Sequence, residues 1–371
     1  MPIAIQPYRK EHEPAVAQFN QRLRRSSADP DLVFSESSVP AWLPRHPESQ
    51  VWNELFVATE GAEVRGAYGL KQEQFLIGEK GLYNVACYHH SLSEGIIDRN
   101  YASVGVLLAR DALERQPLLY VLGMGGFDRP IAKMLKALGF TLVPLPFYFR
   151  VVHPKRFLLQ MRALREKRWR ALLLNLAAYS GLGWLGIRAA QDFRMRKAPG
   201  DFSGNEVGEF SDWADQVWQG AKDSVSMSAL RDGNTLRLLY PPASAHLTRV
   251  RVSRNGKVVG WAVVGERRRD QKFGDMRVGS IVDCWALPEN GVAVVRAATE
   301  ALEKDGVDLI VTNQAHRDWC RAFRSSGFLE GPSTFVLALS KKLVELVQPF
   351  EEKQPWFHVT RADGDGLPRN F

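Results

Sequence analysis

The chain has 371 residues, of which 45% are hydrophobic and 24% are charged, and its net charge is +8. This length favours two domains over one, and the composition excludes a disordered or collagen-like chain. The charge is concentrated in residues 150–197, which hold twelve lysines and arginines against two acids. Because the rest of the chain is close to neutral, a protein that wraps a polyanion over its whole surface is disfavoured.

The three cysteines, Cys87, Cys284 and Cys320, are widely spaced and include no C-x-x-C pair. This pattern argues against a disulfide framework and against a cysteine-rich zinc site, so no metal is expected. The N-terminal residues lack the apolar stretch of a secretory signal. We therefore expect a reducing cytoplasmic location.

The basic segment 150–197 contains an uncharged stretch, residues 171–187, between Arg170 and Arg188. Its length and its three glycines make it a marginal membrane span. Basic flanks on both sides suit attachment to a surface better than crossing, which predicts peripheral contact with the inner membrane face through 150–197. A buried helix between two domains is the alternative.

Hydrophobic periodicity and turn residues predict a continuous series of elements in the first half of the chain. Glycine-containing turns separate three strand-like runs, which indicates an antiparallel meander, and a short apolar run indicates a strand buried on both faces. In chain order we expect a strand at 3–5, a helix at 11–25, an irregular arm at 26–50, strands at 54–59, 64–77 and 82–90, a helix at 101–115, a strand at 118–122, a helix at 129–138 and a closing strand at 141–152.

The second half repeats this order, with Gly66 matching Gly260 and Gly139-Phe140 matching Gly327-Phe328. Repetition of element order and length over a long period indicates a duplicated domain. The expected elements are strands at 247–254, 258–267 and 278–286, a helix at 292–303, a strand at 307–312, a helix at 317–326 and a closing strand at 335–339. The predicted parts are an N-terminal domain (1–150), a basic amphipathic helical linker (151–200), a C-terminal domain (201–345) and a tail that packs back (346–371).

A meander, a helix, a buried strand, a helix ending in Gly-Phe and a last strand together resemble the GNAT-superfamily acetyltransferase fold. The opening residues, Ile5–Arg9 followed by Glu13–Val16, resemble the first strand and helix of that family. The fold class implied is α/β with a mixed sheet, as two tandem GNAT-like domains joined by the basic helical segment.

The resemblance implies acetyl-CoA or another acyl-CoA as the donor substrate. In that family, the loop between the fourth strand and the next helix reads Arg/Gln-x-x-Gly-x-Gly/Ala, and its amides and the helix N-terminus hold the pyrophosphate. The second half has residues 288–293 there, with an acid in place of a cation, so the first half is favoured as the donor site. The first half offers Arg99, Asn100, Tyr101, Ala102, Ser103 and Val104 as cofactor-binding residues.

The resemblance fails at the family's usual general acid, a tyrosine four residues before the glycine of Gly-Phe. Leu135 and Phe323 occupy these positions, and neither side chain can donate a proton. Either both halves have lost this chemistry or another group supplies it.

Three residues near the end of the predicted strand 82–90 are candidate catalytic groups. His89 or His90 could deprotonate an ammonium substrate, and strand alternation predicts that only one of them faces the donor site. Glu94, expected at the mouth of the same site, could take a proton through water. The alternatives are one surface and one packed histidine, and a solvated loop acid.

Gly123 and Gly125 follow the buried strand and precede a helix, so we expect the backbone there to approach the donor, or to form a plain tight turn. Asp283 is an acid in an apolar strand and is a further catalytic candidate. Structural pairing of Asp283 with Arg317 or His316 is the alternative.

The end of the chain begins with two aromatic residues, Trp356 and Phe357, and frayed termini are normally polar. We therefore expect the tail to fold back and to present Asp363 and Asp365 to a polar substrate, together with His316. An ordered but inert tail is the alternative.

These patterns favour an acyl-CoA-dependent N-acyltransferase acting on a polar amine, such as an amino sugar of a cell-surface polysaccharide or its lipid-linked precursor. Tandem GNAT-like folds with a basic helical arm also resemble the aminoacyl-tRNA-dependent peptidoglycan transferases, and tRNA is the one nucleic acid considered as a partner. A third hypothesis is a non-catalytic binding or scaffold protein at the membrane surface.

Overall fold

The computed structural model describes residues 2–26, 33–47, 49–165, 167–195, 201–270 and 273–364. These residues form two compact units. The first unit takes its described residues from 2–144, 334–351 and 363–364, and the second from 145–333 and 352–362. Each unit therefore contains segments from both halves of the chain, unlike the contiguous ranges predicted.

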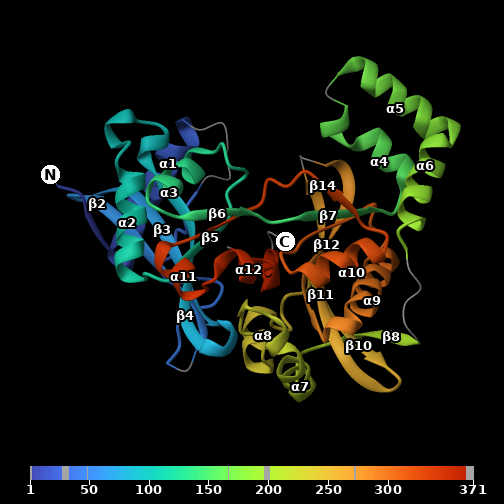
Figure 1. Cartoon of the computed structure of the whole chain (residues 1–371). Helices are drawn as coiled ribbons and strands as arrows, with labels where there is room; N and C mark the ends of the chain where they lie inside the picture. Colours follow the sequence, from blue (N-terminus) through green and yellow to red (C-terminus); the bar gives the residue numbers. More distant parts are fainter. Residues whose placement is uncertain are drawn as a thin grey trace. The chain divides into compact units, whose positions relative to one another are not determined.

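The first unit is built on a mixed sheet (Figure 1). Its strands β1 to β4 pair antiparallel, β4 and β5 pair parallel, and β15 pairs antiparallel with β5 and β6. In spatial order the strands are β1 (Ala4–Pro7), β2 (Val51–Glu60), β3 (Glu63–Leu76), β4 (Leu82–Ser93), β5 (Leu119–Gly123), β15 (Val336–Leu339) and β6 (Thr141–Pro144).

Helices cover both faces of this sheet, because successive strand residues point to opposite sides. α2 (Val104–Arg115) and α3 (Pro130–Ala137) pack on the face that carries Tyr68 and Tyr88. α1 (Glu13–Ser26) packs on the other face. α11 (Lys341–Leu346) follows β15, and α12 (Phe350–Lys353) leads towards the tail.

The second unit repeats the architecture with a second mixed sheet. Residues 201–246, for which no element was predicted, form two helices, α7 (Asp212–Ala221) and α8 (Gly233–Leu239), and two strands, β8 (Phe202–Val207) and the short β9 (Met227–Ala229). In spatial order the sheet contains β14 (Leu329–Gly331), β7 (Phe147–Val151), β13 (Leu309–Asn313), β12 (Gly274–Ala286), β11 (Lys257–Asp270), β10 (Leu247–Arg254) and β8 (Phe202–Val207).

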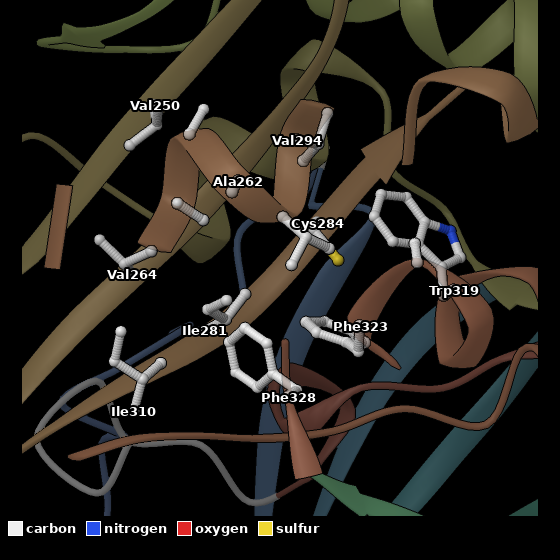
Figure 2. Packing of buried hydrophobic residues seen from close by; sticks show 14 of the residues in the cluster. Val250, Ala262, Val264, Ile281, Cys284, Val294, Ile310, Trp319, Phe323 and Phe328 are labelled. Carbon is white, nitrogen blue, oxygen red and sulfur yellow. The ribbon is translucent and has the colours of Figure 1, made fainter. Parts of the chain in front are cut away.

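The core of the second unit lies between one face of its sheet and two helices, α9 (Gly291–Lys304) and α10 (Arg317–Ser325). α9 contributes its buried apolar stripe, and α10 contributes Phe323. Figure 2 shows the resulting packing, in which strand residues such as Ala262, Ile281 and Ile310 meet the helix residues Val294 and Phe323.

The basic segment is helical as predicted, but it belongs to the second unit instead of linking two free domains. Its helices are α4 (Pro154–Gln160), α5 (Arg168–Ser180) and α6 (Leu182–Asp192) (Figure 1). Phe157, Leu158 and Ala178 pack against Met276 and Val278 on the sheet face opposite α9 and α10. Among the described residues no helix is both long and apolar enough to cross a membrane.

The two closing strands are exchanged between the halves of the chain. The predicted strand 141–152 is split at Pro144-Leu145-Pro146 into β6 of the first sheet and β7 of the second, because proline has no N–H to donate to a ladder. The predicted closing strand of the second domain, β15, lies instead between β5 and β6 of the first sheet. Strand pattern predicts a strand but not its neighbours.

The Gly-Phe pairs end corresponding helices in the same way. Gly139 and Gly327 adopt φ of +87° and +80°, and the next amide bonds back to the carbonyl of residue 135 or 323 at 3.0 and 3.1 Å. This is the Schellman cap, which needs a left-handed residue and so favours glycine. Phe140 and Phe328 then pack into their cores, which explains why the repeated pair marks the duplication.

Candidate functional site

The pairing of β4 with β5 in the first unit is short. It ends at Cys87 and Tyr120, while β4 continues to Ser93 and β5 to Gly123. Among the described residues no other strand of this unit pairs with that edge of β4. The main-chain N–H and C=O groups on this edge therefore lie outside the ladder, at the position where the sequence resemblance places the thioester.

A β-bulge in β4 brings the two histidines together. The register between β3 and β4 shifts between Ala67 and Gly69, so that two residues of β4 lie opposite Tyr68 of β3. One of these two residues is His90, which has a φ of +47°. The Nδ1 atoms of His89 and His90 are 3.0 Å apart, and the ring centroids are 5.2 Å apart. The expectation that strand alternation separates the two side chains is therefore wrong, because the bulge interrupts the alternation.

Gly69 makes room for the His89 ring, since a Cβ at this position would lie 2.5 Å from His89 Cε1. Asn53 donates through Nδ2 to the carbonyl of Trp42 at 3.0 Å, so its Oδ1 faces His89 Nε2 at 3.1 Å. His89 thus carries its proton on Nε2 and accepts at Nδ1 from His90 Nδ1–H. This tautomer leaves the His90 lone pair on Nε2.

Burial, with smaller contributions from the charges of His90 and Lys71, holds the pKa of the His89 imidazole well below its ordinary value. His89 is therefore neutral near pH 7 and can act as an acceptor for His90.

A row of polar residues crosses the sheet beside the histidines. Asn53, Lys71, Cys87 and Tyr120 are neighbours on β2, β3, β4 and β5. Lys71 Nζ lies 3.3 Å from Glu73 Oε1, and both side chains are almost fully buried. The Tyr120 hydroxyl contacts Glu73, and burial raises its pKa well above 10.

The tail reaches this row through its main chain. The carbonyl oxygen of Asp363 accepts from Tyr120 at 2.5 Å and from Lys71 at 3.1 Å. Asp363 is buried, and Asp365 lies outside the described residues. Our sequence analysis missed Asn53, Lys71, Glu73 and Tyr120, although the i, i+2 spacing of Lys71 and Glu73 in a strand could have shown that they share a face.

The predicted phosphate loop divides into an exposed part and a packed part. Arg99, Asn100, Ala102 and Ser103 are exposed, and Ser103 precedes α2 without a side-chain capping bond. The first amides of α2 lack helical partners by geometry, so they can receive an anion.

Two members of the loop have structural contacts instead. Val104 is buried against Gly66, where an added Cβ would lie 2.8 Å from Val104 Cγ1. Tyr101 donates to Glu60 at 3.0 Å and stacks under Arg65. The sequence comparison also passed over Gly105, the second residue of α2, where an added Cβ would meet nothing closer than 3.9 Å.

Glu94 does not lie at the mouth of the site. Its carboxylate is buried and accepts from Arg22 at 2.6 Å and from Arg65 at 3.0 Å. Both of its carboxylate oxygens accept hydrogen bonds from guanidinium groups, so they are occupied by structural contacts. We therefore assign Glu94 a structural role.

Gly123 and Gly125 lie in a left-handed loop directly after β5. Their φ angles are +107° and +73°, those of Met124 and Gly126 are +52° and +124°, and Gly125 N bonds to Gly123 O at 2.7 Å. Glycine is needed here because side chains disfavour these conformations. The loop follows the β5 end that is not paired with β4, so its placement fits either alternative, a donor contact or a tight turn.

The corresponding region of the second unit is filled. β12 and β13 pair only as far as Ser280 and Val311, and beyond that point the tail lies between them. Thr360 forms a β-bridge with Gln314, and Ala315 N bonds to Val359 O at 3.1 Å. On the other side His358 packs against Trp285 with ring centroids 4.5 Å apart, and Thr360 donates to Asp283 at 3.2 Å. Residues 357–360 of the tail thus pack onto the second unit.

Asp283 is a structural anion. Its carboxylate accepts from Arg231 at 2.8 Å, Tyr240 at 2.8 Å, Thr360 at 3.2 Å and the amide of Cys284 at 3.0 Å. A buried carboxylate whose oxygens accept from four donors is enclosed by structural contacts and is not accessible to a substrate. Its partner is Arg231, not Arg317 or His316.

His316 caps α10 and has no space for a substrate. Its Nδ1 accepts from Asp318 N at 3.2 Å, and its Nε2 donates to Ser224 O at 3.2 Å. Burial lowers its pKa. The cavity beside it, lined also by Gly291 and Trp319, has a volume of about 10 Å³, enough for one water molecule but not for a pyrophosphate.

No protein-family model matches the chain, and no curated protein matches it. Among solved structures, Saccharomyces cerevisiae N-myristoyltransferase with bound myristoyl-CoA has a TM-score of 0.53 at 8% identity, covering 92% of this chain and 79% of that chain. The same enzyme with bound myristoyl-CoA and inhibitors has a TM-score of 0.51 at 9% identity. This match covers 92% of this chain and 80% of that chain. A tandem GNAT protein from the clavulanic acid biosynthesis pathway has a TM-score of 0.46 at 13% identity, and the match covers 91% of this chain and 99% of that chain.

At these identities the likeness to the myristoyltransferase shows the fold alone. The chain has a tandem GNAT-like fold, and the predicted mixed α/β class is confirmed.

Proposed function

We propose that this chain is an acyl-CoA-dependent N-acyltransferase and that its first unit binds the thioester. The observation that carries the proposal is the difference between the two sheet edges. Beyond Ser280 and Val311 the second unit is filled by the tail. Beyond Cys87 and Tyr120 the first unit presents an edge of β4, the bulge and the histidine pair.

The donor would lie along β4 with its pyrophosphate at the start of α2. Exposed Arg99, Asn100, Ala102 and Ser103 precede the first amides of the helix, and Gly105 allows close approach to the backbone. The left-handed loop at Gly123 and Gly125 would border the acyl end. Val104 and Tyr101 would support this loop through packing.

The reaction would begin when the acceptor ammonium loses a proton to His90 Nε2. The amine nitrogen then attacks the thioester carbonyl carbon, and main-chain N–H groups on the edge of β4 stabilise the oxyanion. The C–N bond forms, the C–S bond breaks, and coenzyme A leaves as a thiolate that takes the proton shed by the new amide nitrogen. His90 returns its proton to solvent.

The acceptor is proposed to be a polar amine, with an amino sugar of a cell-surface polysaccharide or its lipid-linked precursor as the first class to test. Support comes from the histidine pair beside the edge of β4, since a general base next to the thioester suits an amine that must lose a proton before it attacks.

Donor binding is tested by calorimetric titration of the full chain with acetyl-, octanoyl- and myristoyl-CoA. We expect one thioester per chain and a higher melting temperature with at least one member of the series. Two equivalents per chain would contradict a filled second unit. No binding by any of the three, together with a gel shift by aminoacyl-tRNA, would instead assign the aminoacyl-tRNA-dependent alternative.

Catalysis is tested with His90→Gln, by measuring thiol release from the bound acyl-CoA with glucosamine as the acceptor. We expect kcat to fall about 10²- to 10³-fold while acyl-CoA affinity is unchanged, because the base acts only on the acceptor. The matched control is His246→Gln, which changes an exposed histidine of the second unit. Equal turnover by His90→Gln and wild type would remove His90 from the mechanism.

A further inference from the structure

Exposed apolar side chains gather on one segment of the second unit. Among the described residues, eleven of the seventeen exposed large apolar side chains lie between Leu164 and Met195, in a segment that contains α5 and α6. Large exposed apolar patches mark interaction surfaces in soluble proteins. The sequence bias of this segment towards basic residues therefore coincides with an exposed apolar surface.

α5 is apolar on two opposite faces, and only one of them packs. Leu174, Ala177 and Ala178 belong to the cluster that covers the sheet. Leu172, Leu176 and Tyr179 project from the other face and are 65%, 67% and 70% exposed. A helix that is apolar all round is normally buried on all sides or in contact with lipid.

α6 extends the same surface. Gly181, in the left-handed conformation, joins the two helices, and Leu182 and Leu185 of α6 are 69% and 55% exposed. We call the exposed apolar side chains of α5 and α6 the hairpin surface: Trp169, Leu172, Leu173, Leu176, Tyr179, Leu182, Trp184 and Leu185.

Cations border the hairpin surface and touch its aromatic rings. Lys155 Nζ lies 5.0 Å from the centre of the Tyr179 ring, and Arg170 Cζ lies 5.3 Å from that of Trp169. Aromatic rings beside basic side chains with apolar stems are typical of segments at the boundary between lipid and water. The exposed basic residues of the segment are Lys155, Arg156, Arg162, Lys167, Arg170 and Arg194.

We propose that the hairpin surface docks the protein on an anionic lipid bilayer, with α5 and α6 lying in the plane of the interface. α5 has 13 residues and is about 20 Å long, against about 30 Å of hydrocarbon, so it suits lying in the surface. Charge decides between a bilayer and a second copy. Two copies would bring two strongly basic segments together, whereas anionic headgroups complement them.

The apolar part of the contact is tested by co-sedimentation of the full chain with vesicles of phosphatidylcholine and phosphatidylglycerol at 7:3. We expect binding by the wild type, and a partition coefficient about 100-fold lower for the triple variant Leu172→Ser, Leu176→Ser, Leu185→Ser. The matched control is Leu82→Ser, Leu238→Ser, which removes exposed leucines elsewhere and should leave binding unchanged. Circular dichroism verifies that each variant is folded.

The electrostatic part is tested with Lys167→Ser, Arg170→Ser, Arg194→Ser on the same vesicles. Loss of about fivefold for each cation predicts about 100-fold weaker binding, and the three exposed cations that remain should keep part of the dependence on phosphatidylglycerol. Brominated acyl chains should quench the tryptophan fluorescence of the bound protein less in Trp169→Phe and in Trp184→Phe than in the wild type.

Three results would overturn the proposal. One is wild-type binding that does not depend on phosphatidylglycerol. Another is full binding by the folded triple leucine variant. The third is a concentration-dependent dimer in sedimentation velocity that the leucine variant abolishes, which would assign the hairpin surface to a second copy.

Discussion

The ends of the β4–β5 and β12–β13 pairings occupy corresponding places in two copies of one fold, yet they are built differently. In the second unit the tail, the Arg231–Asp283 ion pair and Tyr240 fill the region with buried contacts. In the first unit the region holds the His89–His90 pair beside an edge of β4 outside the ladder. Duplication lets two copies of one fold use the same place differently, and in the second copy that use is packing.

Both copies nevertheless share a bulge in the strand that borders this region. In β4 it falls at His90, and in β12 it falls at Val282, between the partners of Val263 and Val264. A bulge re-aims side chains locally. In the first unit it joins two histidines, and in the second it precedes an aspartate that is enclosed by donors. The backbone feature is shared, and the side chains decide its use.

The largest expected effect is on Asp283. Asp283→Asn leaves the Arg231 charge buried without its counter-ion, so we expect the free energy of unfolding to fall by about 3–5 kcal/mol. Urea denaturation measures this change. Asp275→Asn, on the same strand but exposed, is the control and should stay within about 0.5 kcal/mol of wild type. A stable Asp283→Asn variant with reduced kcat would restore Asp283 as a catalytic residue.

The next largest effect is the pH dependence of the free energy of unfolding, to which the second unit contributes two buried histidines. Burial holds the pKa of His316 below, and that of His358 well below, the unfolded value of about 6.5, so unfolding takes up protons below that pH. The contribution of these histidines to the free energy of unfolding is therefore fully present above about pH 6.5. It decreases as the pH falls towards the folded-state pKa values. The slope approaches about 1.4 kcal/mol per pH unit for each buried histidine.

This dependence is measured by chemical denaturation between pH 7.5 and 5. His316→Asn keeps a capping oxygen for α10 and should flatten the slope, as should His358→Gln. His89→Gln should remove about as much as either single variant, so the second unit contributes more only because it holds two such histidines. Slopes unaffected by any of these variants would show that other groups titrate on unfolding.

The smallest expected effect is on acyl-CoA affinity, and it compares substitutions at the N-termini of α2 and α9. Ser103→Asp adds a negative charge before α2, which should weaken acyl-CoA binding about fivefold to tenfold, because like charges repel across a short distance. The same change should not lower stability, since an acid suits a helix N-terminus. Asn290→Asp makes the matched change before α9 and should leave affinity unchanged. Equal weakening by both variants would contradict a donor site in the first unit alone.

Most elements could be predicted because local rules govern them. The strand at 247–254 coincides with β10, and the helix at 317–326 differs from α10 by one residue. Periodicity, glycine turns and caps act within a few residues. The candidate site was only partly predictable. Sequence proximity marked His89 and His90, but their contact depends on a bulge, and Asn53, Lys71 and Tyr120 come from three other strands.

Residue type alone also misassigned several side chains. Glu94, Asp283 and His316 are chemically capable, but each is enclosed by partners from distant segments. A carboxylate or imidazole becomes reactive or inert according to those partners, and no local pattern specifies them.

By itself the sequence determined the duplication, the order of the elements, the glycine caps and the concentration of positive charge in one segment, because these depend on residues close together in the chain. Only the tertiary structure decided which sheet each closing strand joins, which of the two corresponding edges the tail fills, and that the basic segment carries an exposed apolar face. Those features depend on contacts between residues far apart in the chain.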